Sequence, residues 1–293
     1  MKPFIISTES TSDLTPELIA ECDVRVIPMT YILDGVEYPT EDGKTLSAEE
    51  FYDRVRKGGM PKTSMVNEDQ AVRWLRALVN EGQKVLHLSF SSALSGTCQS
   101  FLNAAATLNG ELGEERIVVL DTLAASMGQG LLVWYAAQYR KAGDDFETVC
   151  RKMRTLIPKL NHYFTVDSLA HLRRGGRVSG FTALLGSILN IKPELHVDEN
   201  GKLIPIGKVP GRKKAISGLF AKMQERWIPE ENKTVFISHG DCLAEAQSLG
   251  RMIEERLGVQ DIRYGMIGPV IGAHSGPGTI ALFFVAKDKF EKK

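Results

Sequence analysis

The first half of the chain alternates between two hydrophobic patterns. Short apolar runs, typical of buried strands, are followed by longer segments in which apolar residues recur every three or four positions, as in helices with one buried face. This alternation predicts an α/β fold with a parallel sheet whose strands are joined by crossover helices. The expected strands are 4–6, 24–33, 85–88 and 117–120. Helices are expected to begin at 16, at 47 and after 95, and three more are expected over 67–81, 126–142 and 146–156.

Local signals predict where two of these helices begin. Thr15 followed by Pro16 favours an N-cap and the first turn of a helix. Ser47 and Glu50 have the spacing of a capping box, and the glycine pair at 58–59 is expected to end the helix that they start.

The pattern changes near Pro158, and further α/β structure is expected beyond it. A short strand leads to a helix that ends at residues 173–176, and an apolar helix is expected near 182–189. The segment Glu199–Gly201 is a typical hairpin turn between two strands. The remaining expected strands are 191–197, 203–209, 235–238 and 280–286, and the remaining helices are 213–227 and one that ends at 258.

The length agrees with two compact units. A chain of 293 residues is long enough for two domains of about 150 residues each. We therefore expect an N-terminal α/β lobe, residues 1–160, and a C-terminal α/β lobe, residues 161–293, without a long linker between them.

Composition and charge exclude several classes of protein. Lys and Arg number 36, as do Asp and Glu, so the formal net charge is zero and nothing favours binding to a nucleic-acid backbone. The most apolar short run, Ile280–Ala286, is far shorter than the ~20 residues that cross a bilayer, and the N-terminus lacks a signal-peptide core. The four cysteines are scattered without CxxC spacing, so we expect reduced thiols, no metal site and a cytoplasmic location.

One loop rich in hydroxyl groups is a candidate anion site. Residues 89–97 (SFSSALSGT) lie between an expected strand and an expected helix, at the edge where open α/β sheets bind ligands. Ser95 can donate a hydrogen bond to an anion there, and Gly96 allows a ligand to approach closely. An N-cap followed by a turn explains the same residues.

Pro61–Ser64 is a second hydroxyl-bearing loop before a helix. Capping of that helix by Ser64 or Asn67 is the alternative explanation. If the two loops converge, their hydroxyl and amide groups suit a carboxylate better than a polyphosphate, which usually recruits a lysine or a metal ion.

Basic residues in the second half are candidates for holding an oxyanion. Arg177 follows two glycines and Arg212 follows one, so each side chain can project from a loop and clamp an anion. Residues 173–174, also arginines, are explained equally well by the favourable interaction of cations with a helix C-terminus.

One histidine stands apart from the other five. His274 lies in a segment rich in glycine and proline, residues 267–278, which predicts a rigid loop around an exposed imidazole. His87 lies in an apolar strand and is expected to be a hydrogen-bonded core residue.

Taken together, these segments resemble the DegV family of fatty-acid-binding proteins. The matching motifs occur in order over nearly the whole chain, residues 3–290. They are Ser10–Leu14, Pro61–Ser64, Leu94–Thr97, Leu172–Ser179, Ile191–Pro193, Arg212–Ala215 and the segment around His274. The resemblance implies the DegV-type (EDD) fold, a two-lobed α/β fold with a parallel sheet in the N-terminal lobe and a mixed sheet in the C-terminal lobe.

The resemblance also implies a ligand. In this family a long-chain fatty acid is held between the lobes, and its carboxylate is bound by residues that map to Thr63 and Ser95. Gly96 and His274 are expected beside the same carboxylate. Neither a cofactor nor a metal ion is implied.

Some members of the family carry the fatty acid for a bacterial fatty acid kinase. The resemblance implies that a separate ATP-using subunit, similar to dihydroxyacetone kinases, converts the bound carboxylate to an acyl phosphate. Arg177, Arg212 and His274 are then candidates for assisting the transfer or docking the partner, and the chain is not an enzyme on its own. Transient contact with a membrane surface stays open.

Two alternatives to the carrier hypothesis stay open. The chain is a stand-alone hydrolase or phosphotransferase that uses Ser95 and His274, or a lipid-sensing regulator without a kinase partner. The apolar segment 181–189 either packs under the acyl chain or is an ordinary core helix. The chain length and saturation of a bound fatty acid are not readable from these motifs.

Overall fold

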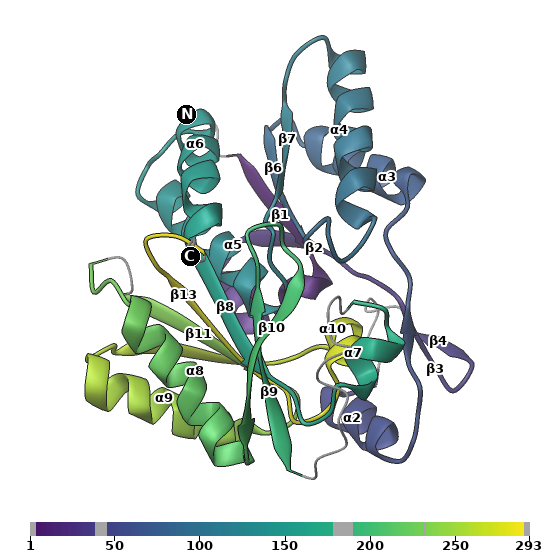
Figure 1. Ribbon diagram of the computed structural model, residues 1–293. Helices are drawn as coiled ribbons and strands as arrows, with labels where there is room; N and C mark the ends of the chain where they lie inside the picture. The colour runs from purple at the N-terminus through teal and green to yellow at the C-terminus, as the bar shows by residue number, and fades with distance from the viewer. Residues whose placement is uncertain (1–3, 39–45, 178–189, 231–232, 290–293) are drawn as a thin grey trace.

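The computed structural model describes residues 4–38, 46–177, 190–230 and 233–289. Its first sheet consists of four parallel strands in the order β2-β1-β6-β7 (Figure 1). These strands are β1 (Ile5–Glu9), β2 (Val24–Ile27), β6 (Val85–Ser89) and β7 (Ile117–Asp121). Every residue of β1 and β6 is buried, as expected for a parallel sheet that is covered on both faces. The parallel sheet predicted for the first half of the chain is confirmed.

The second sheet has six strands in the order β10-β9-β8-β13-β11-β12. Only β11 and β12 pair in parallel, and the other neighbours are antiparallel. The strands are β8 (Leu160–Thr165), β9 (Ile191–Val197), β10 (Leu203–Pro210), β11 (Thr234–His239), β12 (Asp261–Met266) and β13 (Ile280–Val285). This sheet is the mixed sheet that the family resemblance implies.

The helices form layers around and between the two sheets (Figure 1). α5 (Met127–Lys141) lies between them and contacts β1 and β6 of the first sheet and β8, β11 and β13 of the second. Its apolar residues point in nearly every direction, which is typical of a helix enclosed on all sides. α6 (Phe146–Leu156) packs in the same middle layer. The outer face of the first sheet is covered by α3 (Glu68–Val79) and α4 (Thr97–Leu112). The outer face of the second sheet is covered by α8 (Arg212–Arg226) and α9 (Leu243–Leu257).

Short polar side chains begin several helices. Thr15 accepts a hydrogen bond from Leu18 N–H (3.3 Å) at the start of α1 (Pro16–Cys22), as predicted. Ser47 caps α2 (Ala48–Arg56) by accepting from Glu50 N–H (3.1 Å). Asn67, one of the two residues considered for this role, caps α3 in a complete capping box.

The strand prediction is wrong in one place and incomplete in others. The single strand expected at 24–33 is two strands, because β2 ends at Ile27 and β3 (Tyr31–Leu33) belongs to a third, three-stranded sheet. Pro28 follows β2 and has no N–H with which to continue the ladder. The other strands of the third sheet, β4 (Val36–Tyr38) and β5 (Lys62–Thr63), are too short to give a pattern, and the half-exposed β12 has no continuous apolar run.

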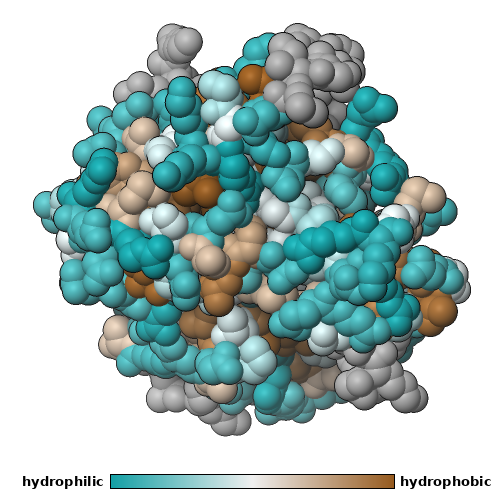
Figure 2. Space-filling view, turned by 90° about the horizontal axis from the view of Figure 1, so that it is seen from below, coloured by the Kyte–Doolittle hydropathy of each residue, from teal (hydrophilic) through white to brown (hydrophobic). Residues whose placement is uncertain are grey.

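The surface gives little sign of a membrane-spanning part. On the face seen in Figure 2, hydrophobic side chains appear in small areas between hydrophilic ones. Among the residues described, no helix combines the length and the apolar character needed to cross a membrane.

A buried carboxylate joins the carboxyl ends of β1 and β6. Glu9 is 0% exposed and accepts hydrogen bonds from Ser89 Oγ (2.6 Å), Phe90 N–H (3.0 Å) and Gln129 Nε2 (2.6 Å). His87 Nε2 lies 3.2 Å from the same carboxylate, so His87 is the hydrogen-bonded core residue that was expected. Burial by itself raises the pKa of Glu9, but His87 and the hydrogen bonds hold this pKa below its ordinary value.

Replacing Glu9 with alanine is expected to lower the free energy of unfolding by about 3–5 kcal/mol, because several buried polar groups lose their shared acceptor. Urea unfolding at pH 7 measures the change. Glu81→Ala is the control, since Glu81 pairs with Arg25 on the surface (3.2 Å) and its loss should matter far less.

The pH dependence of stability provides a second readout of the same change. A lowered pKa means that Glu9 contributes stability above pH 4.5, and that this contribution is lost as the pH falls through the folded-state pKa. The acid-induced loss of stability should therefore be smaller in Glu9→Ala than in the wild type. Equal unfolding free energies for the Glu9 and Glu81 variants would contradict the assignment.

Candidate functional site

A cavity of about 230 Å³ lies where the two large sheets meet α7 (Ala170–Arg174) and α10 (Pro269–Ser275). It is larger than the ~150 Å³ cavity that suffices to bind benzene in an engineered protein. Polar side chains form one part of its wall: Thr63, Ser64, Ser95, Arg177 and His274. Apolar side chains from both halves of the chain form another part: Phe90, Leu94, Phe164, Leu172, Leu203 and Ala281.

Two other hollows of the described surface are larger but chemically different. Their volumes are about 680 and 730 Å³, and charged side chains make up a large part of their linings. Only the 230 Å³ cavity, among these three, joins a compact polar group to a wall of aliphatic and aromatic side chains. We therefore take it as the candidate site.

A small hydrophobic core beneath the polar wall positions Thr63 and His274. β5 pairs with β3 so that Thr63 lies opposite Tyr31, which is fully buried. The same core contains Tyr52 of α2 and residues of α10. Tyr52 also donates its hydroxyl proton to the carbonyl oxygen of Ile267 (2.8 Å), just before α10. The third sheet and α10 are thereby held against each other.

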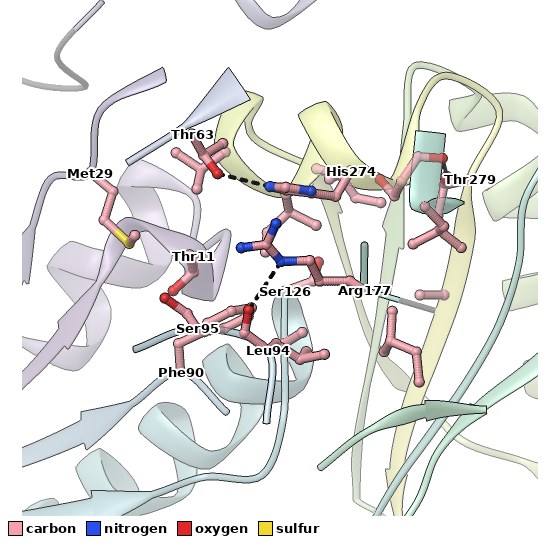
Figure 3. Close-up of a pocket in the computed structure, with 18 of the residues that line it drawn as sticks. Thr11, Met29, Thr63, Phe90, Leu94, Ser95, Ser126, Arg177, His274 and Thr279 are labelled. Atoms are coloured by element: carbon pink, nitrogen blue, oxygen red, sulfur yellow. Dashed lines mark hydrogen bonds between the residues drawn. The ribbon is translucent and has the colours of Figure 1, made fainter. Parts of the chain in front are cut away.

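A short polar contact in the cavity joins residues from these two elements (Figure 3). Thr63 Oγ1 and His274 Nε2 are 2.8 Å apart. Burial, and to a lesser degree the positive charge of Arg177, lowers the pKa of His274 to about 4. The imidazole is therefore neutral at pH 7, and its Nε2 can donate to or accept from the threonine hydroxyl, depending on the tautomer.

Two glycines make room for two histidines where α7 meets α10. A β-carbon on Gly175 would lie 2.2 Å from His274 Nδ1, and one on Gly276 would lie 2.4 Å from His171 Cδ2. Each imidazole thus occupies the space that a side chain on the opposite segment would need. Gly276 also has a φ of +78°, a conformation that favours glycine.

The two hydroxyl-bearing loops converge at the cavity. Val66 N–H donates to Thr97 Oγ1 (3.2 Å), which ties the segment after Pro61–Ser64 to the start of α4. Ser95 Oγ accepts a hydrogen bond from Thr97 N–H (3.2 Å), and Ser95 also lines the cavity. The same residue can therefore stabilise the turn and contact a ligand. A β-carbon on Gly96 would lie 3.0 Å from Sδ of Met65, an exposed side chain that would have to shift slightly to make room for it.

Arg177 places a guanidinium group between these loops and α10 (Figure 3). Its Nε donates to the carbonyl oxygen of Leu94 (3.2 Å), and its Nη1 donates to that of Gly175. Among the described residues, no acidic side chain lines the cavity or forms an ion pair with Arg177. A guanidinium that is held by carbonyl groups and lacks a counter-charge favours an anionic ligand.

Arg212 is not brought to the cavity. It is the first residue of α8, and its Nη2 pairs with Glu245 of α9 (2.9 Å) and also lies 3.7 Å from Cys242 Sγ. The structure therefore brings together five of the six expected site residues: Thr63, Ser95, Gly96, Arg177 and His274. Arg173 and Arg174 lie in the last turn of α7, where cations meet the helix dipole favourably.

The segment around His274 is a helix instead of the rigid loop that was expected. Pro269 occupies the first turn of α10, where its missing N–H does no harm, and His274 lies in the last turn. The imidazole is partly buried and not exposed. A β-carbon on Gly272 would lie 2.7 Å from Tyr52 Oη, so this glycine reflects close helix packing and not a turn.

The sequence motifs did not identify the apolar wall. Its residues come from β8, α7, β10, β13 and the segment after β6, which only the tertiary fold brings together. Ser126, also in the lining, was missed; its Oγ donates to Asp13 (2.6 Å), whose pKa is raised to about 8 by burial. The apolar helix expected near 182–189 lies outside the described residues.

The described residues hold no arrangement typical of a metal site. Within them, His, Cys, Asp and Glu side chains form no group of three or more that could bind a metal ion. The four cysteines are free thiols, and burial raises the pKa of each.

Comparisons of the sequence agree on one family. The model of the DegV family, which is described as an uncharacterised protein family, matches residues 3–287. A DegV domain-containing protein from Clostridium perfringens is 42% identical over 289 residues, which cover 99% of both chains.

Solved structures agree with the sequence comparisons. A DegV family protein from Thermus thermophilus, described for its fatty acid binding, is 31% identical, with a TM-score of 0.85 over 97% of this chain and 99% of that chain. A stearic acid-binding protein from Eubacterium ventriosum is 25% identical, with a TM-score of 0.84 over 97% of this chain and 98% of that chain.

Gly175→Ala is expected to displace the His274 ring and break its contact with Thr63, because the new methyl group needs the space of Nδ1. A more solvated ring should titrate above its present pKa of about 4, which NMR of the imidazole measures. Gly110→Ala is the control, since a β-carbon there meets nothing within 4 Å and alanine favours the helix. An unchanged titration in Gly175→Ala would refute the packing argument.

Proposed function

Because the chain belongs to the DegV family, we propose that it binds a long-chain fatty acid in this cavity, between an N-terminal lobe, residues 1–160, and a C-terminal lobe, residues 161–293. One observation supports the proposal: the cavity joins hydroxyl groups and a guanidinium group, which has no acidic partner among the described residues, to an apolar wall. A fatty acid has the matching chemistry, with an anion at one end and a hydrocarbon chain behind it. The relatives from Thermus thermophilus and Eubacterium ventriosum bind fatty acids.

The polar wall binds the carboxylate in this proposal. Thr63 and Ser95 donate hydroxyl hydrogen bonds, and Gly96 lets the carboxylate approach the start of α4. His274, neutral at pH 7, holds Thr63 in place and faces the same group. Hydroxyl donors bind a carboxylate without neutralising it, so one oxygen stays nucleophilic. Arg177 supplies the positive charge.

The apolar wall supplies most of the affinity. Burying a methylene group contributes about 0.8 kcal/mol, so a chain of about sixteen carbons gains on the order of 10 kcal/mol before the costs of association. The polar groups mainly fix which end of the ligand faces the mouth of the cavity. The wall residues belong to the largest core cluster, so the ligand extends the core.

We further propose that the chain carries the fatty acid for a separate ATP-dependent kinase subunit and works in the cytoplasm. The sequence has no GxxxxGK[ST] phosphate loop of its own. Transfer of a phosphoryl group requires mainly positioning and charge stabilisation, which a carboxylate fixed beside Arg177 can offer to a partner. Arg212 lies outside the cavity on α8, so its proposed part is in docking the partner and not in holding the carboxylate.

The geometry speaks against a stand-alone hydrolase. A serine nucleophile requires a base within hydrogen-bond reach. Ser95 Oγ instead contacts Thr97 Oγ1 (3.0 Å), and His274 Nε2 contacts Thr63. A lipid-sensing regulator uses the same cavity and differs from the carrier only in lacking a kinase partner.

The double substitution Thr63→Ala with Ser95→Ala is expected to weaken fatty acid binding at least tenfold, because two donors to a charged carboxylate are lost. Displacement titration with stearic acid on delipidated protein measures the loss. Thr155→Ala with Ser217→Ala is the matched control, since both hydroxyls donate to carbonyl groups of their own helices far from the cavity. Wild-type affinity in the first variant would refute the carboxylate site.

Arg212→Gln is expected to leave fatty acid binding unchanged while reducing acyl phosphate formation by an added kinase subunit of the dihydroxyacetone kinase type. Arg226→Gln is the control, because Arg226 is another largely buried arginine paired with an acid, Asp288. Equal transfer rates for the two variants would remove Arg212 from the partner interaction. Absence of any transfer to wild-type protein would favour the lipid-sensing regulator.

A further inference from the structure

His162 is a polar side chain within the apolar part of the cavity. It lies on β8, is 4% exposed and lines the cavity together with Phe164. The strand register sets His162 opposite Phe283 and Phe164 opposite Ala281, so all four side chains belong to one face of the sheet. The imidazole centroid lies 4.4 Å from the ring centroid of Phe283 and 5.4 Å from that of Phe164.

His162 lies well away from the groups that bind the carboxylate. β13 begins directly after Thr279, whose Oγ1 donates to the carbonyl oxygen of Ser275 in α10 (3.0 Å). Thr165 pairs with the first residue of β13, and His162 precedes Thr165 by three residues, which is about 10 Å along a strand. A ligand whose carboxylate lies beside His274 therefore passes His162 with the middle or the far part of its chain.

The imidazole of His162 has an unused hydrogen-bonding group. Its Nδ1 is buried and has no partner among the residues that the structure describes. Burial, with the nearby His196 and Lys289, lowers the pKa of His162 well below 6.5, so the neutral ring keeps one donor and one acceptor. The two imidazoles that are 0% exposed, those of His87 and His196, differ because they have partners at both ring nitrogens.

The position of this unpaired group matters more than its presence. Two other lining atoms without partners, Ser275 Oγ and His274 Nδ1, both belong to α10, beside the carboxylate site. Among the described lining residues, only His162 has such an atom within the apolar wall. The atom itself has almost no accessible surface, so the ring must rotate about its Cβ–Cγ bond for Nδ1 to face the cavity. Buried polar groups almost always have a hydrogen-bond partner, and a plain hydrocarbon chain cannot be one.

We propose that His162 selects a fatty acid that carries an oxygen substituent, a hydroxyl or oxo group, in the middle or far part of its chain. This inference rests on the proposed function, since it names the ligand class of the same cavity. A chain hydroxyl can donate to or accept from the neutral imidazole, whereas an unsubstituted chain leaves the ring unpaired. Sites built to hydrogen bond a hydroxyl discriminate against the analogue that lacks it. We expect about tenfold tighter binding, equivalent to ~1.4 kcal/mol.

Competition binding on delipidated full-length protein tests the proposal, with stearic acid and its 3-, 10- and 12-hydroxy derivatives as probes. The wild type should prefer the 10- or 12-hydroxy acid to stearic acid about tenfold, and the 3-hydroxy acid should gain nothing. His162→Phe should lose this preference while binding stearic acid at least as well as the wild type. Phe164→Leu, in the same wall, is the control and should weaken binding of all four acids alike.

Three results would overturn the proposal. The first is that the wild type binds stearic acid as tightly as every hydroxy acid. The second is that His162→Phe keeps the preference for the 10- or 12-hydroxy acid. The third is that Phe164→Leu abolishes this preference as fully as His162→Phe does. If His162→Phe does not fold, NMR of the wild type tests the same contact through the imidazole ¹⁵N chemical shifts of His162. These shifts should change more on binding the preferred hydroxy acid than on binding stearic acid. Equal changes would refute the contact. Failure to bind any of the acids would instead refute the proposed function.

Discussion

The polar half of the cavity depends on the hydrogen bond between Thr63 and His274. It joins residues 211 positions apart and holds the edge of the third sheet against the end of α10. Burial keeps the imidazole neutral at pH 7, and the absence of a side chain on Gly175 leaves room for the ring. Gly175 and Gly276 are therefore explained by the volume of the two histidines.

The local arrangement of charges indicates the ligand of this protein, whereas its net charge does not. The net charge of zero excluded partners but indicated none, whereas the cavity contains Arg177, for which the described residues supply no acidic partner. The guanidinium of Arg177 is oriented by two carbonyl groups, which are weak competitors for an incoming carboxylate. The buried carboxylate of Glu9 shows the opposite arrangement, with its donors already supplied by the protein.

Much of the fold and most of the polar wall of the cavity could be predicted from the sequence, because both follow from local patterns. Alternating strands and helices gave the parallel sheet, and hydroxyl residues between a strand and a helix gave Ser95. Prediction failed where tertiary packing overrides a local signal. Glycine and proline in 267–278 indicated a loop, yet Pro269 starts α10 and Gly272 packs this helix against Tyr52. Arg212 follows a glycine but is held outside the cavity by Glu245. The apolar wall had no local signal, since its residues meet only after both sheets have formed.

The position of α5 has a consequence for how quickly a ligand can come and go. Because this helix is packed against both sheets at once, moving the sheets apart would expose its apolar surface on two sides, at a cost comparable to that of unfolding the core. We therefore expect a ligand to enter and leave the cavity through small displacements of β5, α7 and α10, the segments that surround its polar wall. The residence time of a ligand and the global stability of the protein are then set by different parts of the chain. Substitutions in β5, α7 or α10 can change the residence time without changing the stability.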